Sequence, residues 1–175
     1  RKVILWNTWY SFDQSSVRYF GQIVEWFRKH DDCALIWRPH PMMHAVTKLY
    51  DPESYVKLRE YIAAAKSLPN VIYDEEVSYA AAFSCSIAQI SDYSSLMFLY
   101  LLLDKPVLWI QGPNDRQRRE NPDFFIDWHW MEEAFQIKDI LLFLERIRQG
   151  IDCKKDMRRH VLGRDLPLAD GHCGE

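Results

Sequence analysis

Two short polar segments hold the residue types that could bind a charged ligand. One is Arg38-Pro39-His40-Pro41, and the other is Ser91-Asp92-Tyr93-Ser94-Ser95. An arginine guanidinium presents a planar fork that fits two oxygens of a phosphate. Serines at the start of a helix add hydroxyls, free backbone N–H groups and the positive end of the helix dipole. We therefore expect Arg38, Ser94 and Ser95 to hold a phosphate or pyrophosphate.

A plainer interpretation of these residues stays open beside the first. Ser94 and Ser95 would be good N-cap residues in any helix. His40 lies between two prolines, where it can be a loop histidine that only packs and hydrogen-bonds. His44 lies four residues after His40 and suggests a metal pair, but no third ligand accompanies the two. We therefore expect His44 to be a polar side chain on the surface that binds no metal.

Basic residues after the last predicted strand offer a second set of phosphate contacts. Arg116, Arg118 and Arg119 alternate with Asp115 and Glu120. This mixture of charges is typical of a solvated loop, which is the default interpretation. Contact of Arg116 and Arg119 with a donor or acceptor phosphate is the alternative.

Several motifs that serve phosphate chemistry are missing. The chain has 6 glycines and contains neither G-x-G-x-x-G nor G-x-x-x-x-G-K-[ST], so the usual dinucleotide and P-loop cradles are absent. It also lacks the G-x-S-x-G of a hydrolase nucleophile elbow, and any D-x-D that could chelate a diphosphate-bound metal. A phosphate site here would work through side chains and helix ends, without a metal or a cofactor.

Short apolar strands alternate with helical patterns through the first 110 residues. Strands are predicted at residues 3–6, 33–37, 71–73, 87–90 and 106–110. Helices are predicted, from apolar spacing and capping residues, at residues 17–27, 52–67, 79–83 and 94–103. Apolar strands that alternate with helices form parallel sheets covered on both faces. We therefore predict a three-layer, doubly wound α/β domain that spans residues 1–175.

This sheet positions the polar segments. Ligands of open α/β sheets bind beyond the carboxyl ends of the strands. The Arg38 segment follows the second predicted strand and the Ser91 segment follows the fourth, so both should lie on one rim of the sheet.

The chain continues into an amphipathic helix at residues 138–148 and a basic helix at 152–160. Lys154, Lys155, Arg158 and Arg159 form a basic patch on the second helix. A peripheral membrane contact is one interpretation of this patch. A solvated helix is favoured, because the broad apolar face that membrane binding requires is missing.

The composition excludes several classes of protein. The chain has 175 residues, of which 48% are hydrophobic and 14% aromatic, so it is not a disordered chain. A net charge of −3 argues against a nucleic-acid partner. No apolar run reaches the roughly 18 residues of a membrane span. The widely spaced cysteines are typical of reduced thiols in the cytoplasm. Because the chain starts in a strand and ends without a terminal helix, we expect an excised domain.

An ordered series of motifs resembles a known enzyme family. The series is Arg38-Pro39-His40-Pro41, Leu68-Pro69-Asn70-Val71, Ile90-Ser91-Asp92-Tyr93-Ser94-Ser95 and Asp104-Lys105-Pro106-Val107. It is similar to the C-terminal half of the CDP-glycerol glycerophosphotransferases, the teichoic-acid polymerases and primases. The resemblance implies a GT-B-like enzyme with two Rossmann-like domains. Residues 1–175 would be its nucleotide-donor-binding domain, and the N-terminal acceptor domain would be missing.

The resemblance also implies a role for each candidate residue. His40 would be the active-site histidine, Arg38 would line the pyrophosphate, and Asp92 would shape the turn before Ser94 and Ser95. The two serines would hold phosphate.

The chain departs from the family pattern at two places, and both leave the identity of the donor open. Leu99 stands where the family usually has an acidic residue that meets the ribose or donor hydroxyls. Residues 6–10 lack the family's proline-containing pattern.

The implied activity is transfer of glycerol phosphate from CDP-glycerol to a cell-envelope polymer or a lipid-linked acceptor, with release of CMP. The protein would act in the cytoplasm, on the inner face of the cell membrane. The isolated chain is expected to fold but not to turn over, because such a site needs both halves. Alternatives are a GT-B glycosyltransferase with another nucleotide-linked donor and a non-catalytic nucleotide-binding domain.

Overall fold

One parallel sheet organises the computed structural model, which describes residues 1–112, 115 and 128–166. Its strands are β1 (Lys2–Thr8), β2 (Cys33–Pro39), β3 (Val71–Tyr73), β4 (Ala88–Ser91), β5 (Val107–Ile110) and β6 (Glu132–Ala134). They lie in the order β3-β2-β1-β4-β5-β6. The chain therefore winds from β1 outward to β3, returns to the other side of β1, and continues outward to β6. This is the predicted doubly wound α/β fold.

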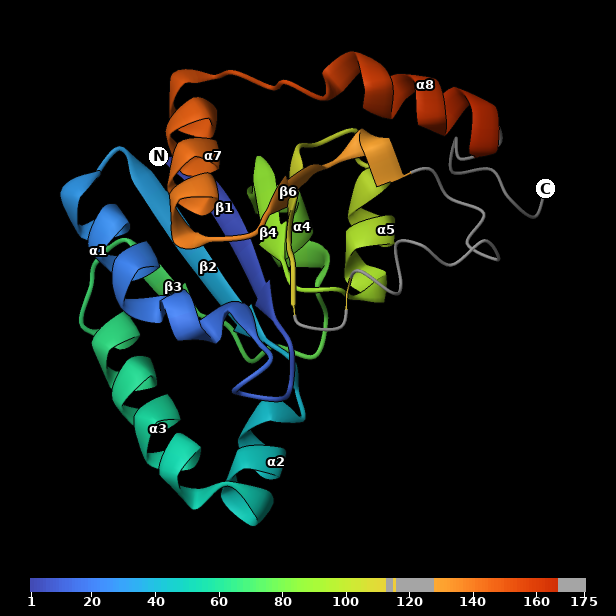
Figure 1. The fold of residues 1–175 in the computed structure, drawn as a ribbon. Helices are drawn as coiled ribbons and strands as arrows, with labels where there is room; N and C mark the ends of the chain where they lie inside the picture. Colours follow the sequence, from blue (N-terminus) through green and yellow to red (C-terminus); the bar gives the residue numbers. More distant parts are fainter. Residues whose placement is uncertain (113–114, 116–127, 167–175) are drawn as a thin grey trace.

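Helices connect the strands and cover both faces of the sheet (Figure 1). The α-helices are α1 (Phe20–Lys29), α2 (Met43–Tyr50), α3 (Pro52–Lys66), α4 (Ala80–Cys85), α5 (Ser95–Leu101), α7 (Ile137–Gln149) and α8 (Lys155–Asp165). Two short 3-10 helices are η1 (Ser16–Tyr19) and η2 (Trp128–Trp130). Local sequence sets several boundaries. Ser15 accepts a hydrogen bond from the backbone N–H of Val17 at the start of η1, and Gly150 ends α7 with a left-handed φ of 81°.

The core consists of two layers, one on each face of the sheet. Successive residues of a strand point to opposite faces. Ile4 and Trp6 of β1 accordingly pack into one cluster with buried residues of α1, α3 and α7. Leu5 packs into the other cluster with buried residues of α4, α5 and α8. The three-layer arrangement predicted from the sequence is confirmed.

Two elements were not predicted from the sequence. Helix α2 begins two residues after Pro41, and its N-cap residue, Met42, makes no side-chain capping hydrogen bond. Strand β6 reads Glu-Glu-Ala, which lacks the apolar run of a buried strand. Pairing with β5 makes it a strand, and Glu132 forms an ion pair with Arg146 of α7. Both elements therefore form through tertiary contacts and not through a local sequence pattern.

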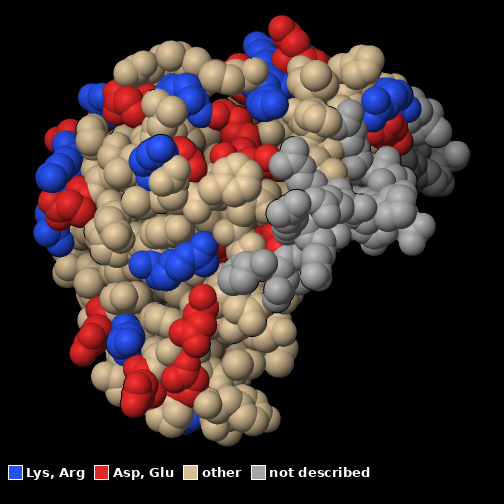
Figure 2. Space-filling model, viewed as in Figure 1, with Lys and Arg blue, Asp and Glu red and all other residues tan. Residues whose placement is uncertain are grey.

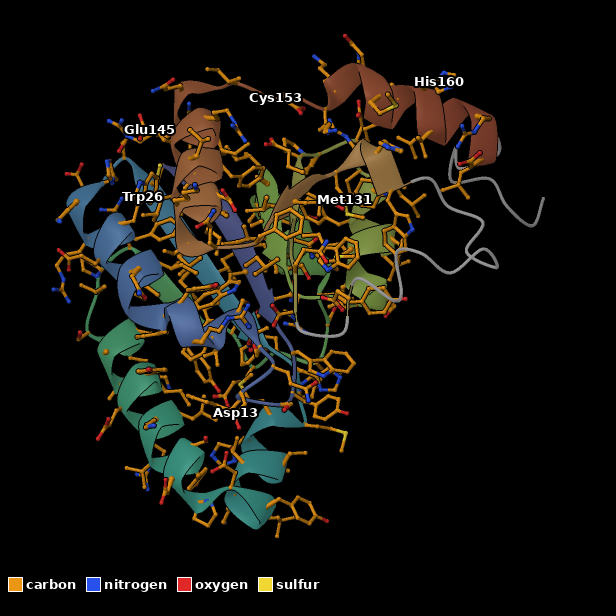
Figure 3. All side chains as sticks on the ribbon, viewed as in Figure 1. Asp13, Trp26, Met131, Glu145, Cys153 and His160 are labelled. Atoms are coloured by element: carbon orange, nitrogen blue, oxygen red, sulfur yellow. The ribbon has the colours of Figure 1, made fainter. Side chains whose placement is uncertain are left out.

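Helix α8 corrects the prediction of a basic surface patch. Arg158 is fully buried and pairs with Asp104 at 3.0 Å and Asp152 at 2.8 Å, and Arg159 also pairs with Asp104. Figure 1 shows α8 at the end of the molecule opposite to α2. In Figure 3, His160 on this helix lies correspondingly far from Asp13, which follows β1. Among the described residues, no helix combines the length and apolar character of a membrane span.

Candidate functional site

The carboxyl ends of three neighbouring strands meet in the centre of the sheet. Asn7 of β1 is in register with Arg38 of β2 on one side and with Ser91 of β4 on the other. The chain winds in opposite directions from this point, which is where open α/β sheets bind ligands. The segments that follow β2 and β4 therefore lie on one rim, as the sequence predicts.

A cavity of about 280 Å³ lies at this rim. Its lining residues are Asn7, Thr8, Trp9, Arg38, Pro39, His40, Pro41, Val77, Tyr79, Asp92, Tyr93, Ser94, Ser95 and Leu96. Five of the predicted site residues, Arg38, His40, Asp92, Ser94 and Ser95, are thus around one cavity. Arg116 and Arg119 lie outside the described residues.

The backbone and ring of His40 are both held in place. Its N–H donates to the carbonyl of Thr8 at 2.9 Å, and its carbonyl accepts from the N–H of Met43 at 2.9 Å. The N–H of Met42 donates to Nδ1 of the ring at 3.1 Å. This bond places the proton of the neutral imidazole on Nε2. Burial lowers the pKa of His40 below its ordinary value. At neutral pH the ring is therefore an uncharged donor through Nε2–H.

Arg38 differs from the open guanidinium that the sequence predicts. The side chain is buried, and Nη1 pairs with the carboxylate of Asp74 at 2.7 Å. Nη2 donates to the carbonyl oxygens of Glu76 at 2.6 Å and Val77 at 3.2 Å. Much of the fork is thus already occupied by the segment after β3. Arg38 has a structural role that the sequence did not reveal, and it shapes one wall of the cavity.

Asp92 also has a wider role than shaping its own turn. Its carboxylate accepts from the backbone N–H of Trp9 at 2.6 Å, the hydroxyl of Ser15 at 2.7 Å and the backbone N–H of Ser16 at 3.0 Å. Burial raises the pKa of Asp92, and these donors oppose that effect. Asp92 therefore joins the segment after β4 to the loop after β1.

Ser94 and Ser95 lie where helix α5 begins. Ser94 has extended backbone angles and occupies the N-cap position, but its side chain makes no capping hydrogen bond. Its hydroxyl is 3.5 Å from that of Ser91. The predicted capping role is wrong for the side chain of Ser94. Leu99, on the same helix, is 39% exposed.

The sequence analysis did not identify two buried polar residues, Asn7, which lines the cavity, and Gln89, which contacts Asn7. The amide of Gln89 donates to Oδ1 of Asn7 at 2.7 Å, and the amide of Asn7 donates to the carbonyl of Arg38 at 3.2 Å. Both residues are buried, and Gln89 Oε1 has no hydrogen-bond partner among the residues that the structure describes. This amide pair links β4, β1 and β2. A polar residue within an otherwise apolar strand was the signal that could have revealed it.

A second cavity of about 180 Å³ adjoins the first, and Arg38, Pro39, His40 and Pro41 line both. His44 also lines this second cavity, and its ring packs edge-on against Tyr55 at a centroid distance of 5.0 Å. Within the described parts of the chain, no group of three His, Cys, Asp or Glu side chains is arranged to hold a metal. On the face drawn in Figure 2, acidic and basic side chains are interspersed.

The model of a known family matches residues 16–165, which include the cavity-lining residues from Arg38 to Leu96 but not those of β1 and the loop after it. The family is described as CDP-glycerol:poly(glycerophosphate) glycerophosphotransferase. This chain belongs to that family. No curated protein matches the sequence significantly.

Solved structures with the same fold include variants of a wall teichoic acid polymerase. A variant of the wall teichoic acid polymerase TagF matches 97% of this chain and 42% of its own, with a TM-score of 0.59 and 15% identity. A TagF variant soaked with CDPG matches 91% of this chain and 36% of its own, with a TM-score of 0.50 and 18% identity. The chain thus spans about two-fifths of the length of these polymerases.

A protein of another kind shares the fold as well. A putative UDP-N-acetylglucosamine 2-epimerase from Listeria monocytogenes matches 91% of this chain and 39% of its own, with a TM-score of 0.60 and 10% identity. The glycerophosphotransferase fold of this chain is therefore a GT-B-like α/β fold, and the fold alone does not select the substrate.

Proposed function

We propose that this domain binds the nucleotide donor, CDP-glycerol, in a transferase that moves glycerol phosphate to a cell-envelope polymer or lipid-linked acceptor. Membership of the glycerophosphotransferase family supports the reaction class. The observation that carries the proposal is the cavity at the centre of the sheet, where His40 faces the same space as Ser94 and Ser95. A TagF variant that shares the fold was soaked with CDPG, which supports the choice of donor.

The reaction breaks one phosphorus–oxygen bond and forms another. An acceptor hydroxyl attacks the phosphorus next to glycerol, and CMP leaves with the bridging oxygen. The proton of the acceptor hydroxyl goes to a base supplied by a second, acceptor-binding domain. Charge on the phosphate oxygens must be stabilised as CMP departs.

The residues of this chain suit that task. Neutral His40, with its proton on Nε2, donates a hydrogen bond to a phosphate oxygen. The hydroxyls of Ser94 and Ser95 donate to the phosphate that departs. Arg38 acts through the wall that it builds with Asp74, and its positive charge, partly offset by that carboxylate, adds to the field in the cavity. We propose that binding requires no divalent metal, which the missing D-x-D supports.

Titration calorimetry tests the choice of donor. CDP-glycerol and CMP should bind the chain in the presence of EDTA, and UDP-N-acetylglucosamine should bind more weakly. Preference for the UDP-linked donor would favour the glycosyltransferase alternative. Loss of CDP-glycerol binding on adding EDTA would disprove the metal-free site.

Transfer activity tests the role of His40. In a protein that contains both domains, His40→Ala should lower the rate about a hundredfold, as expected when a transition-state donor is lost. His44→Ala is the matched control, because His44 is exposed and four residues away. Equal effects of the two substitutions would contradict the assignment. Robust transfer by the 175-residue chain alone would show that no second domain is needed.

A further inference from the structure

Trp9 brings an aromatic ring to the cavity, and the proposed transfer chemistry gives this ring no task. Trp6, Trp37, Trp109 and Trp130 are fully buried, whereas Trp9 is half-buried and lines the cavity. Its ring centroid lies 4.5 Å from that of Tyr10 and 5.7 Å from that of His40. Trp9 and His40 both line the cavity, and Tyr10 packs against these two rings.

The position of Trp9 is fixed from two sides. Its backbone N–H donates to Asp92 at 2.6 Å, which fixes the main chain at Trp9, and Asp92 lies only two residues before Ser94. Tyr10 packs against both Trp9 and His40, with a centroid distance of 5.5 Å to the histidine. A side chain that is already held in place loses little conformational entropy when a ligand binds. Trp9 is therefore a preorganised surface beside the serine hydroxyls.

The cavity thus has two kinds of lining with different chemistry. Ser94 and Ser95 offer hydroxyls that suit phosphate, and Trp9 offers a flat π-face. A ligand that uses both must carry a phosphate and a planar ring within a short distance of each other. Nucleotides meet this requirement, whereas glycerol phosphate has no ring.

We propose that Trp9 stacks on the pyrimidine base of the donor and thereby makes this site selective for a nucleotide over a simple phosphomonoester. The inference rests on the proposed function, because it takes the donor to be a CDP-linked molecule. Stacking of a base on an aromatic side chain strengthens binding by about tenfold or more.

Calorimetry with two ligands separates ring binding from phosphate binding. CMP carries base and phosphate, and glycerol 3-phosphate carries a phosphate only. In the 175-residue chain, Trp9→Leu should weaken CMP binding about tenfold or more and leave glycerol 3-phosphate unchanged. Trp9→Phe keeps a ring and should retain most of the CMP affinity. Trp26→Leu is the control for loss of an indole elsewhere, because Trp26 is a buried core residue of α1 that packs against His30 and does not line the cavity.

Each other outcome counts against the inference. Equal losses for CMP and glycerol 3-phosphate, or no loss for CMP, would show that Trp9 only supports the loop. Should Trp9→Leu fail to fold, equal CMP binding by Trp9→Phe and the unchanged chain would support the stack, and a loss for both ligands would refute it. Failure of the unchanged chain to bind either ligand would overturn the proposed function itself.

Discussion

A buried arginine lies near each end of the sheet, and the two arginines have different roles. At the amino end, Arg158 of α8 is fully buried and pairs with Asp104 and Asp152. At the carboxyl end, Arg38 is 8% exposed, pairs with Asp74 and also lines the cavity. The charge of Arg158 is neutralised by carboxylates of its own chain. Arg38 stands beside side chains that keep polar atoms available.

This difference separates the structural end of the molecule from the functional end. Around Arg38, the ring of His40 is half-buried, and the hydroxyl of Ser94 makes no capping bond. Around Arg158, the charged groups neutralise one another. A basic residue in the sequence therefore indicates ligand binding only where the fold leaves polar atoms of neighbouring side chains available to a ligand.

The largest effect is expected at the amino end. Arg158→Met removes both ion pairs of this buried guanidinium, so that Asp152 loses its partner and Asp104 keeps only Arg159. Breaking a buried pair costs about 3 kcal/mol, which corresponds to a fall in Tm of roughly 6–12 °C for a chain of this size. Thermal unfolding of the variant and the unchanged chain measures this fall in Tm. Arg159→Met is the control, because Arg159 is 59% exposed and should change Tm little. Similar falls in Tm for both variants would show that the buried ion pairs of Arg158 stabilise the fold no more than the exposed pair of Arg159 does.

At the carboxyl end, Arg38→Lys tests how the guanidinium is used. Lysine keeps the charge beside Asp74 but cannot also reach the carbonyls of Glu76 and Val77 as a planar fork does. We expect the unliganded chain to lose about 1–2 kcal/mol of unfolding free energy. Denaturant titration without ligand measures this loss. Unchanged stability with weaker CMP binding would instead make Arg38 a direct ligand contact, as the sequence alone suggests.

Local sequence patterns predicted the fold and the position of the site, but not the partners of the buried arginines. Apolar strands alternating with helices predicted the parallel sheet, and the rule for carboxyl ends placed His40 and Ser94 on one rim. The partner of Arg38 was unpredictable, because Asp74 is 36 residues away and meets it only through the pairing of β2 with β3. The burial of Arg158 depends likewise on Asp104, 54 residues away. Side-chain partners distant in sequence leave no local pattern.

A smaller effect is expected from the pH dependence of stability. Burial lowers the pKa of His40 in the folded chain, so the unfolded chain binds its proton more readily. The folded state should therefore lose stability as pH falls below about 6.5, the pKa of an unperturbed histidine. His40→Asn should show less of this loss between pH 7.5 and pH 5.5 than the unchanged chain. An identical pH profile for both chains would contradict the effect of burial.

The smallest effect is expected from Ser94→Ala, and Ser15→Ala makes the comparison quantitative. Both serines stand at the start of a helical segment. The hydroxyl of Ser15 accepts from the N–H of Val17 at 3.2 Å and donates to buried Asp92 at 2.7 Å, so its loss should cost about 1–2 kcal/mol. The hydroxyl of Ser94 makes no capping bond, so Ser94→Ala should leave the unfolding free energy within about 0.5 kcal/mol of the original. Its CMP binding should nevertheless weaken, because that hydroxyl is available to the phosphate. Denaturant titration and calorimetry on the same two variants measure both quantities. A stability loss at Ser94 as large as at Ser15, with CMP affinity unchanged, would make Ser94 a helix cap and remove it from the site.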